Sequence, residues 1–422
     1  MPEPTSSLQI PEYRRYLTAR LLAVMATISM VVLIGYQVYD VARTDYGMDR
    51  SAAALQLGLL GLAQFVPLFV LTPVAGIAAD RFDRRRVVLF ANSIDALVAL
   101  ALALLTANDA LNLPILFTLA GLHGAARVFN GPALSAIAPN IVPSRLLPQA
   151  IAQSSIAWQS GTVIGPALGG FLFAYDAPLP YFVSAATLLA SGALISSVRP
   201  VRAVHEGPRL KPVRQMIDGF SFVKSNRFLL GCITLDLFAV LLGGATAMLP
   251  VFARDILQAG PEGLGLMRGA TAAGAALVGV FLSFRPFSTE VGMKMLLGGA
   301  AFGAFTVGFA LSRSLMLSLV MLAGLGAADM ISVFIRNTLI QLNTPDNMRG
   351  RVSAISGLAI SASNELGEMR AGAAAAVIGA TGAVALGGAA AIVVTALWAW
   401  LYPELRQAKT FTSQFLDKER SP

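Results

Sequence analysis

The chain has 422 residues, of which 56% are hydrophobic and only 13% are charged, and its mean hydropathy is +0.69. About 25% of the residues in a soluble domain are charged, so this composition predicts an integral membrane protein and excludes a soluble one. One cysteine and two histidines provide no basis for a metal site or another cofactor. The net charge of +8 raises the question of nucleic acid, which the distribution of the basic residues answers below.

Twelve apolar segments are long enough to cross the membrane as helices, which takes about 20 residues. They are apolar on every side and lack the alternation of barrel strands. We therefore predict an all-α membrane protein with twelve transmembrane helices in two six-helix bundles. The segments are residues 17–42, 53–79, 87–107, 114–137, 149–174, 180–198, 227–254, 263–283, 293–311, 315–338, 353–379 and 382–402.

The polar stretch 199–226 is the longest inner connection and separates six spans from six. We predict an N-terminal bundle at 1–198, a cytoplasmic linker at 199–226, and a C-terminal bundle with a cytoplasmic tail at 227–422. On this topology 20 of the 31 basic residues lie in inner segments, 3 in outer segments and 8 within the spans, the asymmetry expected of a multi-pass protein with both termini in the cytoplasm. No basic patch remains for a nucleic-acid partner.

The loop between the second and third spans carries a dense cluster of charges. It resembles the signature of the major facilitator superfamily, Gly-x-x-x-Asp-Arg-x-Gly-Arg-Arg, and matches it at Gly76, Asp80, Arg81, Arg84 and Arg85. The chain departs at Asp83, where the family usually has Gly, and a side chain there disfavours the tight turn that Gly allows. An acid among arginines at a helix end can form charge-assisted bonds and meet a neighbouring helix N-terminus. These residues predict a cytoplasmic gate; the alternative is a simple topology anchor.

The fifth span contains a run of small residues around a proline, at Gly161, Gly165, Pro166, Gly169 and Gly170. Glycines four apart let another helix approach closely, and proline bends the helix that carries it. The run looks like the antiporter motif of the drug:proton antiporter branch, and that resemblance implies export. Ordinary packing between membrane helices is the alternative.

Further positions look like the enterobactin-exporter subgroup: 335–338, Pro345, 348–353 and 363–368, with 127–132 in the first half. This resemblance implies the export of a siderophore or another small amphipathic molecule, in the inner membrane of a bacterium. It also implies a transporter that acts as a monomer. Subgroup membership does not specify the cargo.

Charged side chains inside the spans are the candidates for proton coupling or the substrate cavity, because a charge in the bilayer costs ~3 kcal/mol and normally faces a cavity or a partner. Glu365 and Glu368 are three residues apart, so they share a helix face and oppose each other's ionisation. A polar face paired with Arg370 is their alternative. Asp329 shares a stripe with Ser332 and Arg336, and Arg336 is near enough to the inner end to snorkel.

Asp236 stands alone in its span, as a coupling residue or a structural hydrogen-bonder, and the resemblance makes Arg127 of the fourth span a plausible partner for it. Tyr36 and Gln37 can contact an amphipathic cargo by stacking and hydrogen bonding. Asp95 is interpreted as structural. His123 is interpreted as a packing residue, although a histidine can titrate near neutral pH.

Three functional classes compete for these features. A proton-coupled exporter working by alternating access accounts for both motifs, with the bilayer, protons and a small molecule as its partners. The alternative is an importer or lipid flippase of the same fold. A membrane enzyme or receptor finds no support, since the sequence has no phosphate-binding Gly-x-x-x-x-Gly-Lys-Ser/Thr loop.

Overall fold

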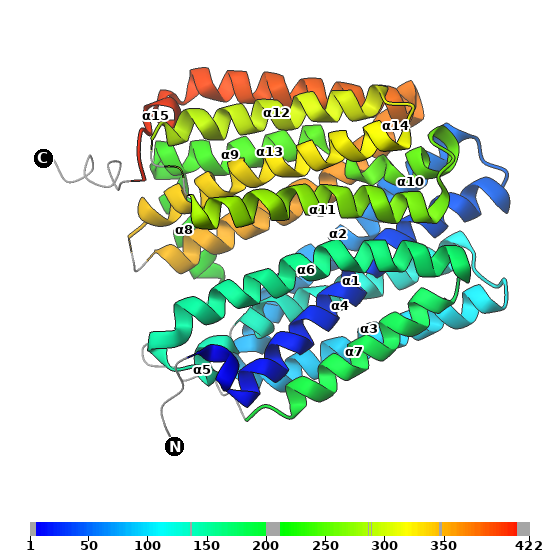
Figure 1. Cartoon of the computed structure of the whole chain (residues 1–422), viewed down its shortest axis with the longest axis horizontal. Helices are drawn as coiled ribbons and strands as arrows, with labels where there is room; N and C mark the ends of the chain where they lie inside the picture. Colours follow the sequence, from blue (N-terminus) through cyan, green and yellow to red (C-terminus); the bar gives the residue numbers. More distant parts are fainter. Residues whose placement is uncertain are drawn as a thin grey trace, which may run out of the picture. The chain divides into compact units, whose positions relative to one another are not determined.

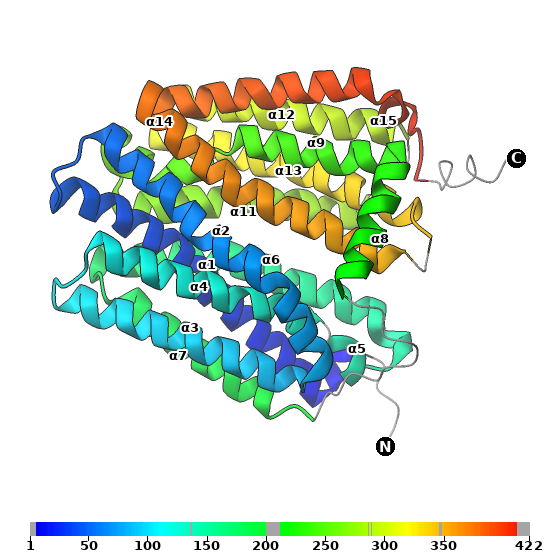
Figure 2. The same cartoon turned by 180° about the vertical axis from the view of Figure 1, so that it is seen from behind.

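The structure, a computed structural model, describes residues 6–135, 137–199, 212–285, 287, 289–345 and 348–411. These residues form helices and no strand (Figure 1; Figure 2). The long helices are α1 (Pro11–Thr44), α2 (Arg50–Arg81), α3 (Arg84–Ala107), α4 (Leu113–Ser135), α6 (Leu147–Tyr175), α7 (Leu179–Ser196), α9 (Arg227–Gly243), α11 (Gly260–Phe284), α12 (Val291–Leu311), α13 (Leu315–Leu342) and α14 (Arg349–Leu401). The short ones are η1 (Ser7–Gln9), α5 (Ala138–Ile141), η2 (Ser144–Leu146), α8 (Pro212–Ser225), η3 (Thr246–Met248), α10 (Leu249–Val251), η4 (Phe252–Ile256) and α15 (Pro403–Gln407).

Each of the twelve predicted segments lies mostly on helix, and the all-α membrane fold is confirmed. Among the described residues, nine helices are long and apolar enough to cross a membrane. One of these is the 53-residue α14, which Gly379 interrupts at φ +75°, a backbone conformation that residues with side chains rarely adopt. The predicted segments 353–379 and 382–402 are therefore two helices that meet at this glycine.

The chain divides into two compact units. The first unit comprises Met1–Met48, Leu62–Arg209 and Ala259–Gly269, and the second comprises Asp49–Gly61, Leu210–Gln258 and Ala270–Pro422. The start of α2 thus belongs to the second unit, and the start of α11 belongs to the first. The predicted bundles at 1–198 and 227–422, with the linker between them, stay a prediction.

In the first unit, α1 packs against α6 and α7, and α3 packs against α7 and α4 (Figure 1; Figure 2). Two tyrosines of α1 are buried at the start of the helix and bind α6. Tyr13 donates its hydroxyl to the Ala150 carbonyl oxygen at 2.6 Å, and the Tyr16 hydroxyl lies 3.0 Å from Ser154 Oγ. These bonds hold the entry of α1 against the beginning of α6.

In the second unit, α14 packs against α9 and α12, and α12 packs against α13. A separate hydrophobic core includes the buried Leu229, Met295 and Leu339. The linker predicted from sequence contains α8, which Asp218 attaches to α14 by an ion pair with Arg351 at 3.5 Å. Each unit therefore has a hydrophobic core of its own.

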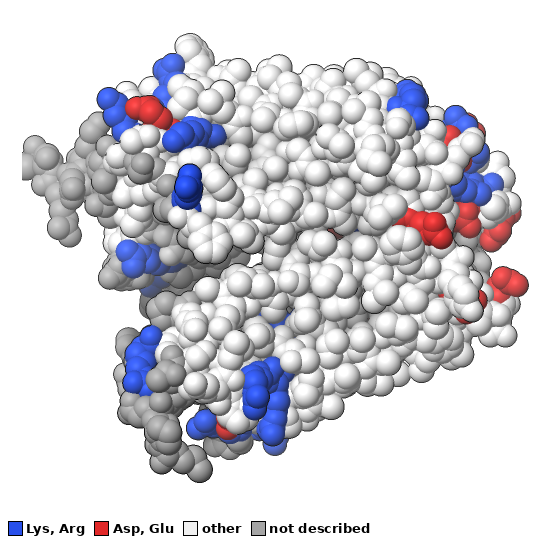
Figure 3. Space-filling model, in the orientation of Figure 1, with Lys and Arg blue, Asp and Glu red and all other residues white. Residues whose placement is uncertain are grey.

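Charged side chains gather near the ends of the helices on the face seen in Figure 3, and uncharged residues cover the lengths between them. This distribution is what a membrane requires, because charge at the helix ends reaches water while the middle faces hydrocarbon. Buried acidic, basic or histidine residues are few in the described part of the chain: Asp95, His123, Asp236, Arg336 and Glu365.

Candidate functional site

A buried ion pair of the second unit joins α9 to α13. Arg336 Nη1 donates to Asp236 Oδ1 at 2.5 Å, and the two side chains are 3% and 9% exposed. The pair links helices 100 residues apart in sequence. Removing either partner would leave the other as an uncompensated buried charge, which is strongly unfavourable.

A second carboxylate belongs to the same place. Asp329 and Ser332 follow one face of α13 towards Arg336, as the predicted stripe requires, and these three residues line one small cavity with Asp236 and Thr395. The guanidinium of Arg336 is paired with Asp236, Asp329 is a second carboxylate in the same cavity, and with both acids ionised the group carries a net charge of −1. We name Asp236, Asp329 and Arg336 the acid cluster.

The position of the Arg336 side chain differs from the one predicted from sequence. Its position near the end of the span predicted a side chain that snorkels to water, whereas the structure buries it against Asp236. Attraction to a buried carboxylate outweighs access to solvent here, because the acid would otherwise be unpaired in an apolar helix bundle. The stripe 329–332–336 was the available signal, but nothing in the sequence connects it to α9.

The two glutamates of α14 lie in different surroundings. Glu365 is buried, while the side chain of Glu368 lies beside Gly61 of α2, where a Cβ would come within 3.4 Å of Glu368 Oε2. Arg370, the suggested partner, donates its Nε to the Leu241 carbonyl oxygen on α9 at 2.9 Å. The coupling role of the two glutamates stays a prediction.

In the first unit, the candidate residues Arg127, Gln37 and Tyr36 each contact a side chain on a neighbouring helix. Arg127 Nη1 donates to Gln64 Oε1 at 3.3 Å, and Asp236 has Arg336 rather than Arg127 as its partner. Gln37 donates to Thr106 Oγ1 at 3.1 Å and accepts from the Tyr181 hydroxyl at 2.7 Å. The Tyr36 ring meets Phe173 edge to face, with centroids 5.7 Å apart.

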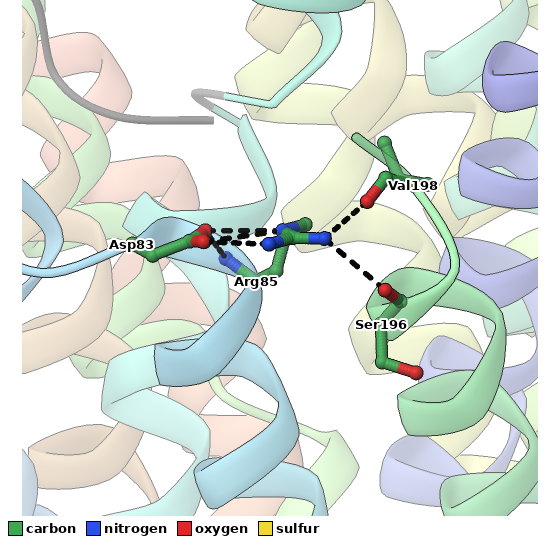
Figure 4. A network of polar contacts seen from close by, with 4 residues as sticks. All are labelled: Asp83, Arg85, Ser196 and Val198. Carbon is green, nitrogen blue, oxygen red and sulfur yellow. Dashed lines mark hydrogen bonds and ion pairs between the residues drawn. The ribbon is translucent and has the colours of Figure 1, made fainter. Parts of the chain in front are cut away.

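The charged loop between α2 and α3 is held by Asp83, the residue at which the chain departs from the superfamily signature. Its carboxylate caps α3 by accepting from the Arg85 backbone N–H at 3.1 Å, and pairs with Arg85 Nη2 at 2.8 Å (Figure 4). Arg85 Nη1 then donates to the carbonyl oxygens of Ser196, at 3.1 Å, and Val198. With φ −59° at Asp83, glycine is not needed at this turn.

The other residues of the predicted gate lie on either side of this turn. Gly76 and Asp80 lie on the last turns of α2, and the Asp80 side chain falls outside the described residues. Arg81 is exposed and Arg84 is half-buried. Arg85 therefore ties the start of α3 to the end of α7, while the predicted latch through Asp80 stays a prediction.

The glycines of the span-5 motif are points of close helix contact. A Cβ on Gly165 would lie 2.5 Å from the Met25 carbonyl oxygen, and one on Gly169 would lie 2.0 Å from Ser29 Oγ, so both positions face α1. Gly161 meets Val24 in the same way. Gly170 faces α11, where a Cβ would lie 2.6 Å from the Pro261 carbonyl oxygen. Pro166 lies inside α6 between these contacts.

An all-helical membrane chain with a buried acid cluster and these two motifs defines a multi-pass transporter of the major facilitator superfamily, not an enzyme. The chain belongs to the transmembrane secretion effector family, whose profile matches residues 16–419. It is therefore a multi-pass membrane protein whose family and relatives are associated with efflux.

Named relatives agree with this assignment. The chain is 26% identical to the enterobactin exporter EntS of Escherichia coli O127:H6 (strain E2348/69 / EPEC) over 349 residues, 82% of this chain and 80% of that protein. The EntS protein of Shigella boydii serotype 18 (strain CDC 3083-94 / BS512) matches with the same identity and coverage.

Solved structures show the same fold. A bacterial homolog of the human lysosomal transporter Spinster aligns with a TM-score of 0.69 at 15% identity, covering 98% of this chain and 99% of that chain. A D-xylose-proton symporter aligns with a TM-score of 0.70 at 14% identity, covering 96% of this chain and 100% of that chain. At these identities the likeness concerns the fold alone.

Proposed function

We propose that the protein exports a small amphipathic molecule, siderophore-like or drug-like, by proton-coupled alternating access. The observation that carries the proposal is the acid cluster, in which the Asp236–Arg336 pair and Asp329 line one cavity inside the second unit. The similarity to the enterobactin exporter supports export and an amphipathic cargo. We place the protein in a bacterial inner membrane as a monomer, with both termini in the cytoplasm.

The charge of the acid cluster explains how it would respond to protons. With both acids ionised it carries a net −1, and burying net charge without compensation is costly. One proton on either carboxylate makes the cluster neutral, and a proton on Asp236 weakens its pairing with Arg336. Because the pair joins α9 to α13, this weakening alters the contact between two helices and can bias the side to which the carrier opens.

Other predicted residues take supporting roles in this proposal. Glu365 and Glu368 are further proton acceptors, with the proton belonging to the pair rather than to one of them. Arg127, Tyr36 and Gln37 are assigned to the substrate cavity. Gly76, Asp80, Arg81, Arg84 and Arg85 form the cytoplasmic gate.

The cargo is tested by comparing the small molecules retained in cells that lack the protein with those in cells that express it. An exporter predicts that one compound is enriched inside the deletion cells and falls when the wild-type gene is restored. Enterobactin, which the named relatives export, is the first compound to measure. An unchanged intracellular profile, together with no transport of the candidate compounds in vesicles, would contradict export.

The runner-up function is an importer or lipid flippase of the same fold. Inside-out vesicles separate the two directions, because an exporter accumulates its cargo in them when their interior is acidic. Uptake by intact cells without accumulation in inside-out vesicles would favour an importer. Movement of a fluorescent phospholipid between leaflets, without release of a soluble cargo, would favour a flippase.

A further inference from the structure

A second buried pair of titratable groups lies in the first unit, far from the acid cluster in sequence. His123 Nδ1 on α4 is 2.6 Å from Asp95 Oδ1 on α3, and both side chains are 0% exposed. The other polar atom of each, His123 Nε2 and Asp95 Oδ2, is buried without a hydrogen-bond partner in the described part of the chain. The mechanism proposed above uses neither residue.

A separate network of neutral groups joins the same two helices at the next position along α3. Asn130 Nδ2 donates to Asn92 Oδ1 at 2.9 Å, and Asn92 Nδ2 donates to Ser191 Oγ at 3.1 Å. Ser191 donates in turn to the Ala19 carbonyl oxygen at 2.8 Å. Contacts between α3 and α4 are therefore polar at two successive positions, but only the Asp95–His123 position can change its charge.

The distance requires a proton between the two groups. Two lone pairs cannot meet at 2.6 Å, so one hydrogen lies between His123 Nδ1 and Asp95 Oδ1. With that single proton the pair carries a net charge of −1 in a fully buried place. A second proton, bound to His123 Nε2, turns it into an imidazolium–carboxylate pair with no net charge and a stronger, charge-assisted bond.

No other charged group contacts the pair among the described residues. The nearest cation in sequence is Arg127, one turn further along α4, whose guanidinium is directed to Gln64 of α2. Arg85 is paired with Asp83 at the start of α3, and Arg20 of α1 donates to Tyr16. The remaining charged or titratable residues on the first unit's parts of the helices packed around the pair are Tyr181 on α7, Arg84 and Arg86 on α3, Asp80 and Arg81 on α2, and Glu12, Tyr13, Arg14, Arg15, Tyr36, Tyr39, Asp40 and Arg43 on α1.

We propose that Asp95 and His123 form a proton-binding site of the first unit, which takes up its proton at His123 Nε2. The ligand is a proton from water, and no other bond forms or breaks. Uptake strengthens the bond between α3 and α4, so the site links acidity to the packing of these two helices. The inference does not rest on the proposed transport function, because it concerns proton binding by the protein itself.

The chain makes this site directly observable, because it contains only two histidines, His123 and His205. The variant His205→Gln, labelled with nitrogen-15 in its histidine and reconstituted in lipid, leaves one imidazole to measure by solid-state NMR. We expect a signal in which both ring nitrogens of His123 carry protons at the acid end of a pH series, and the Nε2 proton to be lost as the pH rises. A His123 that stays neutral with one protonated nitrogen down to about pH 5 would overturn the proposal.

Two variants in the same background test the role of Asp95. Asp95→Asn keeps the shape but removes the carboxylate, and it should abolish the doubly protonated signal. Ser191→Ala breaks the neutral network without changing charge, and it should leave that signal in place. Persistence of the doubly protonated imidazole in Asp95→Asn would contradict the site. The measurement needs no substrate, so failure of the transport proposal would leave it intact, and its wild-type arm stands even if Asp95→Asn does not fold.

Discussion

Arg336 on α13 holds Asp236 on α9 by a hydrogen bond of 2.5 Å between Nη1 and Oδ1, and both side chains are almost fully buried. Two helices that are remote in the chain thus depend on one pair of opposite charges for part of their contact. Asp329 lines the same cavity, so a second acid lies near this pair. This arrangement is the physical basis for the transport proposal.

We expect the pair to be energetically coupled. Asp236→Ala should lower the free energy of unfolding by about 3–5 kcal/mol, because it leaves Arg336 buried without its partner. Asp236→Ala combined with Arg336→Ala should lose much less than the sum of the two single changes. Thermal unfolding of the purified variants in detergent measures this, with Glu404→Gln as the control at a pair with the exposed Arg227. Strictly additive losses would mean that the two side chains do not interact.

Packing at the span-5 motif should be intolerant of a single methyl group. Gly165→Ala places a carbon 2.5 Å from a backbone oxygen of α1, so the helices must separate. We predict a loss of about 1–3 kcal/mol in the free energy of unfolding. Gly357→Ala on α14 is the matched control, since nothing lies within 4 Å of its added Cβ and alanine favours helix. Equal stability of the two variants would contradict close packing of α6 on α1.

The contact of Arg85 with the end of α7 predicts a local change in dynamics. Arg85→Ala removes the donor to the Ser196 and Val198 carbonyl oxygens, so the end of α7 should open more often. Hydrogen exchange should become faster in peptides covering 194–199. Arg86→Ala, at an exposed neighbouring position, should leave their exchange unchanged. Unaltered exchange in the Arg85 variant would remove this tie between α3 and α7.

The interruption of α14 should require glycine. Gly379 has φ +75° and ψ 161°, a region in which a side chain costs about 1–3 kcal/mol. Gly379→Ala should therefore lower the thermal unfolding midpoint. Gly382→Ala, three residues away on the following helix, is the control and should have little effect or raise the midpoint. A Gly379 variant as stable as wild type would argue against the bend seen here.

The fold could be predicted from sequence because the membrane imposes it. A segment such as 315–338 must be helical in hydrocarbon to pair its backbone groups, so apolar length alone located α13. The glycine spacing at 161, 165 and 169 likewise indicated a surface for close approach, which α1 occupies. What the sequence left open was which helix would fill that surface.

Partners of the buried charges were the harder part, because they depend on which helices are neighbours. Arg127 was the expected partner of Asp236, and the partner is Arg336. Asp95 and His123 were interpreted separately, yet they pair. The sequence held a signal, because each of these two spans carries two polar residues: Asn92 and Asp95 on α3, and His123 and Asn130 on α4. In the structure Asn92 bonds Asn130 and Asp95 bonds His123, so the pairs run in opposite order along the two helices, as antiparallel neighbours require.

The central claim is tested most directly by transport into proteoliposomes of the compound that accumulates in cells lacking the protein. With an imposed pH gradient, wild type should concentrate the compound, and a protonophore should abolish this. Asp236→Asn and Asp329→Asn should lose gradient-driven accumulation while still equilibrating the compound down its own gradient, and Glu404→Gln should behave as wild type. If both acid-cluster variants concentrate the compound as wild type does, the acid cluster does not couple transport to protons.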